Sequence, residues 1–428
     1  MSHYTVMKIP ETAPDIGTIS DSAITPSATL VKYARECNEN YYHWDDLKHR
    51  DFGDCSRIDV WRLTKISRLI SCTYIGISNL EFSYNLIDQH SIRLLHRIDS
   101  GFKSGPPGYV GMKPSILTAS SSMEESIASS QIEGASISVF EAKRMLRSKT
   151  VPKDRSEKMI FNNYAAMQFI KEHSAEPLTC ELIKKIHEVI TGGLIDSNES
   201  GSFRGDDSIV VKDVYEDVVC HIPVKHESIE SLLVGLCEYV NDDSLEVHPI
   251  VKGISIHFIL AYIHPFTDGN GRVSRALFYW YCLKRGYTAI ECLSLSKAIK
   301  NHRKGYDEAY LHSETDSNDI TYFIRYNLRM LNESMDDLDS YIERKNAEQR
   351  DVFKIVDGRD PSHRQSQILR DMFLNREPVS QYELSVKYQT SVASIRRDLV
   401  KMIDMGLIRM SGKDGHRMLY VYNAKDTS

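Results

Sequence analysis

The sequence predicts a mainly α-helical protein, with one β-hairpin in its central body and a small module of helices and strands at its C-terminal end. Apolar residues recur three and four positions apart in residues 59–80, 91–102 and 139–148, as in helices that bury one face. The clear β signal of the body is confined to residues 203–224. The pattern changes again in residues 360–428, where short helical segments precede two alternating runs.

Composition sets the bounds on the class of protein. The 428-residue chain is 41% hydrophobic and 26% charged, which is ordinary for a globular protein of two or three domains. Its N-terminus lacks the basic start and apolar run of a signal peptide, and no later apolar stretch is long enough to cross a bilayer. The eight cysteines show no CxxC pairing, so neither a zinc site nor a disulfide framework is indicated. We therefore expect a soluble, cytoplasmic protein without a membrane partner.

The N-terminal region, residues 1–120, is expected to hold an arm followed by helices. Its first thirty residues are rich in Pro, Ser, Thr and Asp and show no sustained period, as in an extended or lightly packed segment. Glycines and prolines predict a loop at residues 103–111. Residues 121–345 then form the expected central body, which a long helical segment, residues 318–346, closes.

The predicted hairpin consists of two β-branched runs on either side of residues 213–217. An isolated hairpin is only marginally stable in water, so it must pack on the helices or serve a function. Two strongly apolar segments with helical spacing follow it, residues 228–241 and 251–263. The second leads directly into the sequence HPFTDGNGRVSR, residues 264–275.

The HPFTDGNGRVSR segment has the composition of an anion site. Pro265 disfavours helix at His264, so the imidazole is presented from a turn. Gly269, Asn270 and Gly271 tolerate unusual backbone angles and leave N–H groups free to point at one spot. A second helix begins there with its positive end toward the same spot. We interpret the segment as an anion cradle.

The charged residues of the cradle indicate the chemistry. Arg272 and Arg275 lie three apart on one helix face, where their guanidinium groups can bind phosphate oxygens in pairs. Asp268 is suited to hold a divalent cation, since Mg²⁺ takes one or two carboxylates together with substrate phosphate oxygens. An uncharged His264 can accept the proton of an incoming hydroxyl. The set predicts phosphoryl or nucleotidyl transfer, whereas His257, on an apolar helix face, is expected to be a core histidine.

Taken singly these features are most often structural, because a histidine after a helix is usually packed or solvated and GNG is usually a turn. All fixed positions of the Fic signature, HPFx(D/E)GNGRxxR, are nevertheless present, and the segment resembles that family. The resemblance implies a helical enzyme that transfers AMP from ATP to a hydroxyl of a target protein. It further implies that His264 is the base, that Phe266 anchors the loop and that Asp268 holds Mg²⁺.

The same resemblance assigns the ATP contacts. It implies that the α- and β-phosphates are held by loop residues, namely Gly269, Asn270, Gly271 and Arg272. It leaves Arg275 for the γ-phosphate.

Two further regions match the family. Residues 203–224 correspond to its flap, which aligns an extended target segment by main-chain pairing. Ser296, Arg303 and Tyr306 have the spacing of its segment near the nucleotide base. Asp307 stands where the family often has a second tyrosine, so the contacts with adenine stay open.

Residues 122–134 predict a short, self-contained helix. Ser122 and Glu125 have capping-box spacing, and Gly134 is a suitable helix stop. By itself this segment would be interpreted as a solvated helix with a serine-rich face.

Beside the Fic signature, the same helix has a regulatory interpretation. Ser129 and Glu133 lie four apart on one face, and with Gly134 they resemble the inhibitory pattern (S/T)xxxE(G/N). The resemblance implies that Glu133 pairs with Arg275 and so takes the partner of the γ-phosphate. We therefore expect an autoinhibited enzyme.

The C-terminal region, residues 360–428, has a different pattern. Three short helices are predicted at residues 363–374, 380–389 and 391–408, and two strands at residues 409–423. Three helices followed by a two-stranded wing predict a winged helix-turn-helix.

The third of these helices is a candidate for DNA contact. It resembles the recognition helix of DeoR-type regulators, with Ser394, Arg396 and Arg397 free to meet bases or phosphates. Residues 361–428 carry a net charge of +4, and residues 1–360 carry one of −10. A charge of +4 is small for a region that binds DNA. Many winged helices bind proteins instead.

Three functions follow from these patterns. The first is an autoinhibited protein adenylyltransferase that uses ATP and Mg²⁺ to modify a Ser, Thr or Tyr of a protein target presented to the flap, or of itself. The second is a nucleotide-sensing transcriptional regulator that binds DNA through the winged helix. The third is a phosphodiesterase that removes AMP from a modified target. A homodimer is left open.

Overall fold

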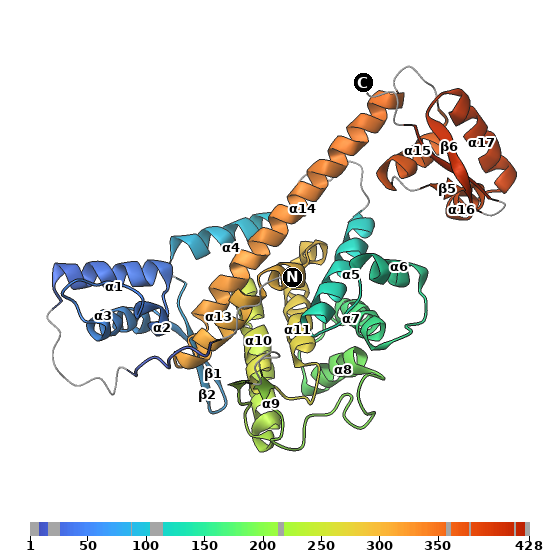
Figure 1. Cartoon of the computed structure of the whole chain (residues 1–428). Coiled ribbons are helices and arrows are strands. Elements are labelled where there is room, and N and C mark those ends of the chain that lie inside the picture. The colour runs from blue at the N-terminus through green and yellow to red at the C-terminus, as the bar shows by residue number, and fades with distance from the viewer. Residues whose placement is uncertain are drawn as a thin grey trace. The chain divides into compact units, whose positions relative to one another are not determined.

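The computed structural model describes residues 8–15, 26–86, 88–102, 114–212, 218–356, 361–375, 378–414 and 417–423. The chain divides into two compact units, one made of the described residues up to Asp336 and the other of those from Asp337 onward. Helix α14, Thr321–Val356, runs across this boundary (Figure 1). No helix within the described ranges is long and apolar enough to span a membrane.

The first unit is mainly helical, as the sequence predicts. Its N-terminal elements are α1 (Ala28–Asn40), α2 (Trp44–Leu47), α3 (Arg57–Ile70), β1 (Thr73–Ile77), β2 (Leu80–Tyr84) and α4 (Gln89–Phe102). The elements that follow are α5 (Pro114–Ile132), α6 (Val139–Ser148), α7 (Arg155–Glu172), α8 (Cys180–Thr191), β3 (Val211–Lys212), β4 (Val219–His221), α9 (Ile229–Asn241), α10 (Pro249–Ile263), α11 (Asn270–Lys284), α12 (Leu295–Asn301) and α13 (Arg303–Thr315).

The N-terminal arm is described in part. Residues 8–15 have no regular secondary structure, and the Ala13 N–H donates to the Thr315 carbonyl over 2.7 Å, which ties this segment to the end of α13. The rest of the predicted arm, and the predicted loop at residues 103–111, lie outside the described residues.

A second hairpin corrects the prediction of one continuous helical segment at residues 59–80. Helix α3 ends at Ile70, and strands β1 and β2 pair antiparallel through a turn in which Ser78 has a φ of 51°. Ile75, Ile77 and Phe82 are buried. The β-branched side chains of β1 favour a strand over a helix, and the hairpin packs one face on the body instead of standing alone.

Helix α5 corrects the prediction of a short helix capped at Ser122. It begins at Pro114, so Ser122 lies inside it and Glu125 has a different partner. The serine-rich face is buried: the hydroxyls of Ser126 and Ser130 donate to the carbonyls four residues earlier, over 2.7 and 2.8 Å. The predicted end is correct, since α5 stops at Ile132 and Gly134 has a φ of 93°.

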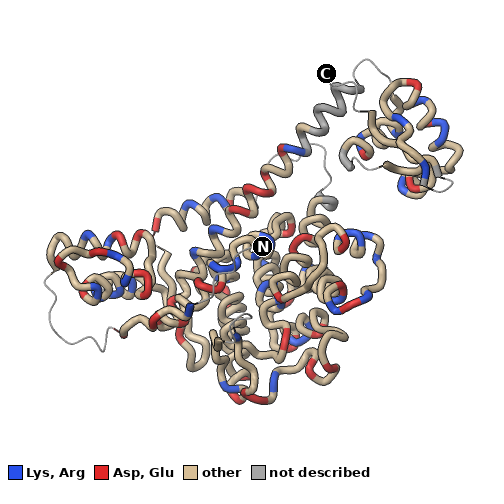
Figure 2. The backbone as a smooth tube through the Cα atoms, viewed as in Figure 1, with Lys and Arg blue, Asp and Glu red and all other residues tan. Residues whose placement is uncertain are grey.

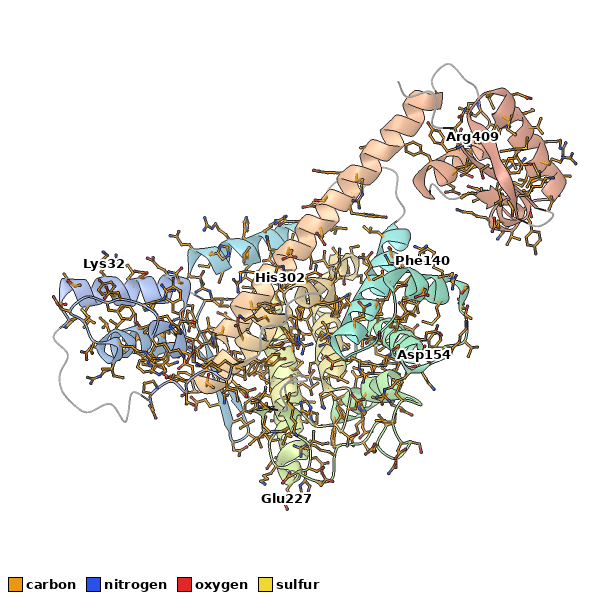
Figure 3. All side chains as sticks on the ribbon, in the orientation of Figure 1. Lys32, Phe140, Asp154, Glu227, His302 and Arg409 are labelled. Carbon is orange, nitrogen blue, oxygen red and sulfur yellow. The ribbon has the colours of Figure 1, made fainter. Side chains whose placement is uncertain are left out.

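Helices α10 and α11 form the centre of the first unit. They pack against each other, and twelve of the fifteen residues of each are buried. Figure 3 shows side chains filling the space around them. A helix that is buried on every side has little freedom to move. The first six residues of the HPFTDGNGRVSR segment, 264–269, are the short connection between these two helices, and the rest begins α11, so the segment is held from both ends.

The second unit contains α15 (His363–Asn375), β5 (Val379–Ser380), α16 (Gln381–Lys387), α17 (Val392–Asp404), β6 (Ile408–Asp414) and β7 (Arg417–Tyr422). These are the three helices and two strands that the sequence predicts, with a short extra strand, and the sheet order is β5-β7-β6. The unit has its own core, which includes Ile368, Leu384, Leu399 and Tyr420.

Candidate active site

His264 ends helix α10 in a left-handed conformation, with a φ of 52°. Its side chain is partly exposed, and Nδ1 lies 3.2 Å from the Ala261 carbonyl, to which it can only donate. The other ring nitrogen, Nε2, then carries the lone pair. Burial lowers the pKa of His264 to about 4, against the opposing effect of the Ala261 contact. The imidazole is therefore uncharged near neutral pH.

The loop after His264 is fixed by two buried residues. The Asn270 side chain accepts from the Phe266 N–H over 2.9 Å and donates to the Phe266 carbonyl over 2.8 Å. Phe266 itself is fully buried. Because both ends of the Asn270 amide are used in this way, its side chain holds the loop here rather than facing outward to a phosphate.

His187, on α8, was not identified from the sequence. Its ring stacks on Phe266 with the centroids 3.7 Å apart, Nδ1 accepts from the Gly201 N–H over 3.0 Å, and Nε2 donates to the Asp268 carbonyl over 2.9 Å. Burial lowers the pKa of His187 to about 4. A neutral ring with its proton on Nε2 therefore joins α8 to the loop. Its position on the apolar face of α8 is the one sequence signal that marks it.

The N-terminus of α11 already faces a carboxylate. Gly269 is the N-cap residue with a φ of 89°, and a Cβ added at Gly271 would overlap Glu133 Oε1. The positive end of α11 and its free N–H groups favour an anion at this place. The predicted cradle thus accommodates an anionic group, supplied here by the chain itself.

Arg275 joins α11 to the end of α5. Its Nη2 donates to Glu133 Oε1 over 2.8 Å and to the Ser129 carbonyl over 3.0 Å, and its Nε donates to Ser129 Oγ over 2.9 Å. Burial alone would raise the pKa of Glu133, but the guanidinium group outweighs it and lowers that pKa. The structure thus brings together Ser129, Glu133 and Arg275.

Arg272 and Asp268 form the remaining charged part. Arg272 Nη2 lies 3.1 Å from Asp268 Oδ1, Arg155 Nη2 lies 3.2 Å from Oδ2, and Arg272 Nε is buried without a hydrogen-bond partner. No group of three or more His, Cys, Asp or Glu suited to a metal ion occurs within the described residues. Asp268 could thus hold Mg²⁺ only together with oxygens from a bound phosphate.

A family model named Fic/DOC family matches residues 177–282, the stretch from the start of α8 through most of α11. The match contains the whole HPFTDGNGRVSR segment with the geometry described above. Residues 177–282 are a Fic domain.

Curated relatives carry the same name. A protein adenylyltransferase Fic of Culex quinquefasciatus is 29% identical over 203 residues, which cover 46% of this chain and 37% of that protein. One of Nematostella vectensis is 23% identical over 271 residues, which cover 61% and 59%. The chain thus spans less than two thirds of the length of these relatives.

Solved structures resemble the fold. A Fic family protein from Desulfovibrio desulfuricans G20 superposes with a TM-score of 0.52 at 17% identity and covers 79% of this chain and 96% of its own. Fic-1 from Caenorhabditis elegans has a TM-score of 0.50 at 21% identity and covers 74% and 85%. The fold around the Fic domain is therefore that of known Fic proteins.

Glu125 attaches α5 to the Fic domain and its neighbours. This buried carboxylate accepts from the Ser296 N–H and from the Tyr279 hydroxyl, each over 2.9 Å, and also from the hydroxyls of Ser294 and Ser296. Burial raises the pKa of Glu125. Ser296, expected near a nucleotide base, is thus engaged by α5.

The other residues expected near the base lie close to the end of α5. Arg303 Nη1 donates to the Ile132 carbonyl over 2.9 Å, and Arg303 Nε lies 2.8 Å from both carboxylate oxygens of Asp307. Tyr306 is buried with its hydroxyl 2.9 Å from Nε2 of His257, which is buried as predicted. The departure at Asp307 therefore places an ion pair where the family often has an aromatic ring.

The hairpin that corresponds by resemblance to the flap, residues 203–224, is short, and this segment is called the flap below. Strands β3 and β4 pair antiparallel, with Val211 opposite His221 and Lys212 opposite Val219, and residues 213–217 lie outside the described residues. Its base is held by Arg204, a residue that the sequence did not reveal.

The residues predicted for DNA contact lie in the second unit, on α17. Arg396 and Arg397 are exposed, and Arg397 Nη2 donates to Ser394 Oγ over 3.3 Å. Arg409, on β6, is exposed as well (Figure 3). Basic and acidic residues are interspersed along both units (Figure 2).

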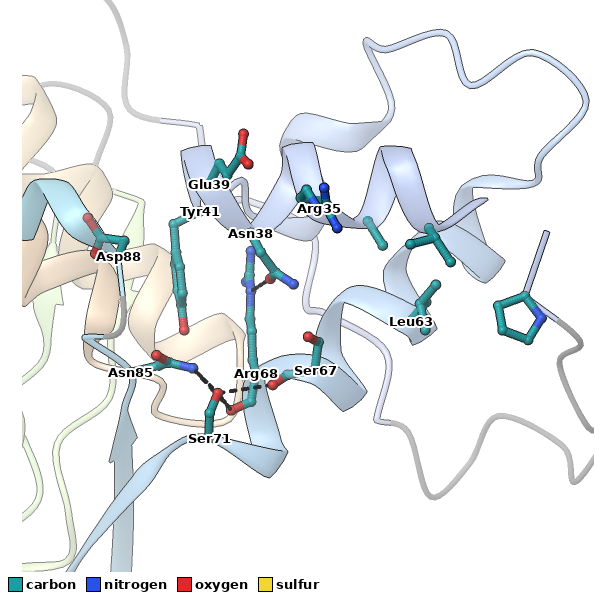
Figure 4. A pocket seen from close by; sticks show the side chains of 13 residues that line it. Arg35, Asn38, Glu39, Tyr41, Leu63, Ser67, Arg68, Ser71, Asn85 and Asp88 are labelled. Atoms are coloured by element: carbon teal, nitrogen blue, oxygen red, sulfur yellow. Dashed lines mark hydrogen bonds between the residues drawn. The ribbon is translucent and has the colours of Figure 1, made fainter. Parts of the chain in front are cut away.

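A cavity of about 470 Å³ lies in the N-terminal part of the first unit, between α1 and α3 (Figure 4). Asn38, Tyr41 and Arg68 line it, and Arg68 is already bound by Asn38 Oδ1 over 2.9 Å and by the Tyr42 carbonyl over 2.9 Å. No residue of the HPFTDGNGRVSR segment lines this cavity.

Proposed function

We propose that the chain is an autoinhibited protein adenylyltransferase that transfers AMP from ATP to a hydroxyl group of a protein. The observation that carries the proposal is the Glu133 carboxylate, which occupies an anion cradle at the N-terminus of α11 and binds Arg275. A terminal phosphate would use the same donors, because both groups are anions with several acceptor oxygens. The adenylyltransferase names of the relatives support the same reaction.

The residues of the site have defined tasks in this reaction. Neutral His264 takes the proton of the target hydroxyl on Nε2 while the hydroxyl oxygen bonds to the α-phosphorus. The bond from that phosphorus to the bridging oxygen breaks, and pyrophosphate leaves. The free N–H groups of α11, Arg272 and Arg275 hold the phosphates. When bound beside Asp268, Mg²⁺ would offset phosphate charge.

The test is AMP transfer from ATP labelled at the α-phosphate, with the chain itself and a lysate as acceptors. We expect strong labelling with Glu133→Gly, weak labelling with the unchanged chain, and a loss of roughly 100-fold or more when His264→Ala is added. Glu246→Gly, at an exposed loop position, is the matched control and should stay weak. Equal labelling of the unchanged and Glu133→Gly chains would refute autoinhibition.

The reverse reaction is separated in the same assay. Label that leaves a modified acceptor faster with the unchanged chain than with Glu133→Gly would indicate removal of AMP, with Glu133 acting on a water molecule instead of blocking a phosphate.

For the second unit we propose binding of double-stranded DNA. It is supported by exposed basic residues on α17 and β6, namely Arg396, Arg397, Lys401, Arg409 and Lys413. Phosphate contacts make affinity depend on salt. Arg396→Ala with Arg397→Ala should weaken binding and lower the salt slope by about 2, whereas Lys32→Ala on exposed α1 should not. Equal affinity of both variants for DNA at low salt would remove this proposal.

A further inference from the structure

The C-terminal end of α10, which presents His264, is capped by residues of the flap segment. The Tyr262 carbonyl lies 2.8 Å from His221 Nε2, the His264 carbonyl accepts from Arg204 Nε over 3.0 Å, and the Pro265 carbonyl accepts from the Arg204 N–H over 2.9 Å. The last carbonyls of a helix have no partner within it and carry partial negative charge. Flap residues therefore complete the end of α10.

Arg204 also closes the base of the flap. It lies before β3, yet its Nη2 donates to the carbonyl of Val224, which follows β4. Its Nη1 donates to the Asp206 carbonyl over 2.7 Å and to Asp207 Oδ1 over 3.2 Å. The side chain is only 1% exposed. One buried guanidinium group thus links both flap arms to the turn that carries His264.

His221, on β4, makes the second link through both ring nitrogens. Nε2 faces the Tyr262 carbonyl at 2.8 Å, and Nδ1 faces Glu314 Oε2, on α13, at 2.9 Å. A carbonyl cannot donate, and a neutral imidazole has one N–H. Nε2 therefore donates to the Tyr262 carbonyl, and Nδ1 faces Glu314 Oε2. The side chains of His221 and Glu314 are 11% and 17% exposed, so this contact lies largely out of the solvent.

We propose that Arg204 and His221 are positioning residues for the transfer reaction, and that Glu314 orients the His221 ring by its contact with Nδ1. They fix strand β4, where a target segment would pair, relative to the turn that holds His264. This proposal rests on the proposed function for its role in catalysis, but the coupling itself is a property of the free protein. The charged or titratable groups around His221 are Glu314, Tyr262 and His264.

The test compares Glu314→Gln with Glu314→Ala by hydrogen–deuterium exchange of residues 218–224 and 258–266, without any ligand. Glu314→Ala removes the partner of His221 Nδ1 and frees the ring to turn away from the Tyr262 carbonyl. We expect protection of both segments to fall roughly tenfold relative to the unchanged chain.

The two variants separate a hydrogen-bonded link from simple packing. A glutamine amide can donate to Nδ1 while Nε2–H still donates to Tyr262, so Glu314→Gln should keep protection close to that of the unchanged chain. Equal protection of Glu314→Ala and the unchanged chain, or an equal loss in both variants, overturns the proposal.

The catalytic part is tested in the Glu133→Gly chain by self-labelling with ATP. His221→Gln should lower AMP transfer roughly tenfold without changing the dissociation constant for ATP, because it acts on the acceptor side. Equal loss of transfer and of ATP binding would contradict a positioning role. If Glu133→Gly transfers no AMP at all, the proposed function fails while the exchange experiment still decides the link.

Discussion

The two sides of the HPFTDGNGRVSR loop are held by different kinds of contact. On its anion side, one carboxylate, Glu133, binds one guanidinium group, Arg275. On its flap side, Arg204 and His221 bind main-chain carbonyls at the end of α10. Glu133 is 32% exposed, whereas the Arg204 side chain is 1% exposed.

This difference indicates which contact can be exchanged. A phosphate can replace the Glu133 carboxylate without leaving Arg275 unpaired, because both supply acceptor oxygens. An anionic ligand cannot replace the flap contacts, because main-chain carbonyls accept hydrogen bonds and a phosphate offers further acceptors. We therefore expect regulation on the anion side and a constant geometry on the flap side.

Removing the Arg204 contacts on the flap side should have the largest effect on the free energy of unfolding. Arg204→Ala removes the buried donors of several carbonyls and should lower the free energy of unfolding by about 3–5 kcal/mol. Urea denaturation measures this. Arg144→Ala, at an exposed position on α6, is the control and should change stability by less than about 0.5 kcal/mol. A loss from Arg204→Ala as small as that of the control would contradict the fixed role of this side.

Acid should have the second-largest effect on the free energy of unfolding, through His187. Its pKa is about 4 in the folded chain and about 6.5 when unfolded, so the unfolded chain binds more protons between these values. The stability that the neutral ring contributes is present above pH 6.5 and is lost as the pH falls toward 4, roughly 3 kcal/mol in all. His187→Gln should remove that part of the acid dependence of the urea midpoint, whereas His90→Gln, at an exposed position, should not.

Removing the Glu133 charge on the anion side should have the smallest effect on the free energy of unfolding. Glu133→Gln removes a partly exposed charge, and Arg275 keeps both Ser129 acceptors, so the loss should be about 1 kcal/mol. Urea denaturation again measures it. If this variant unfolded as readily as Arg204→Ala, the distinction between an exchangeable and a fixed side would not hold.

The contact of Glu133 with Arg275 could be expected from the sequence, whereas the flap contacts could not. His264, Arg275, Ser129 and Glu133 belong to two short patterns that resemble those of the Fic family, and that resemblance implied the contact. Arg204 binds carbonyls 20 and 60 positions away. Every residue type has a main-chain carbonyl, so the sequence does not indicate which one accepts the bond. The fold therefore had to be known before its role could be seen.

Two errors have local causes. Glu125 has capping-box spacing with Ser122, but its buried position among the Tyr279 and Ser296 donors outweighed that local signal. Residues 73–77 continue the apolar spacing of the helix before them, but their β-branched side chains and their pairing with residues 80–84 outweigh that spacing.

The central claim is that Glu133 occupies the place of a terminal phosphate. It is tested most directly by titrating ATP and ADP against the unchanged chain and Glu133→Gly. We predict that the unchanged chain binds both nucleotides about equally and that Glu133→Gly prefers ATP by roughly tenfold, a preference that adding Arg275→Ala removes. The same ratio of the two dissociation constants in the unchanged and Glu133→Gly chains would contradict the account.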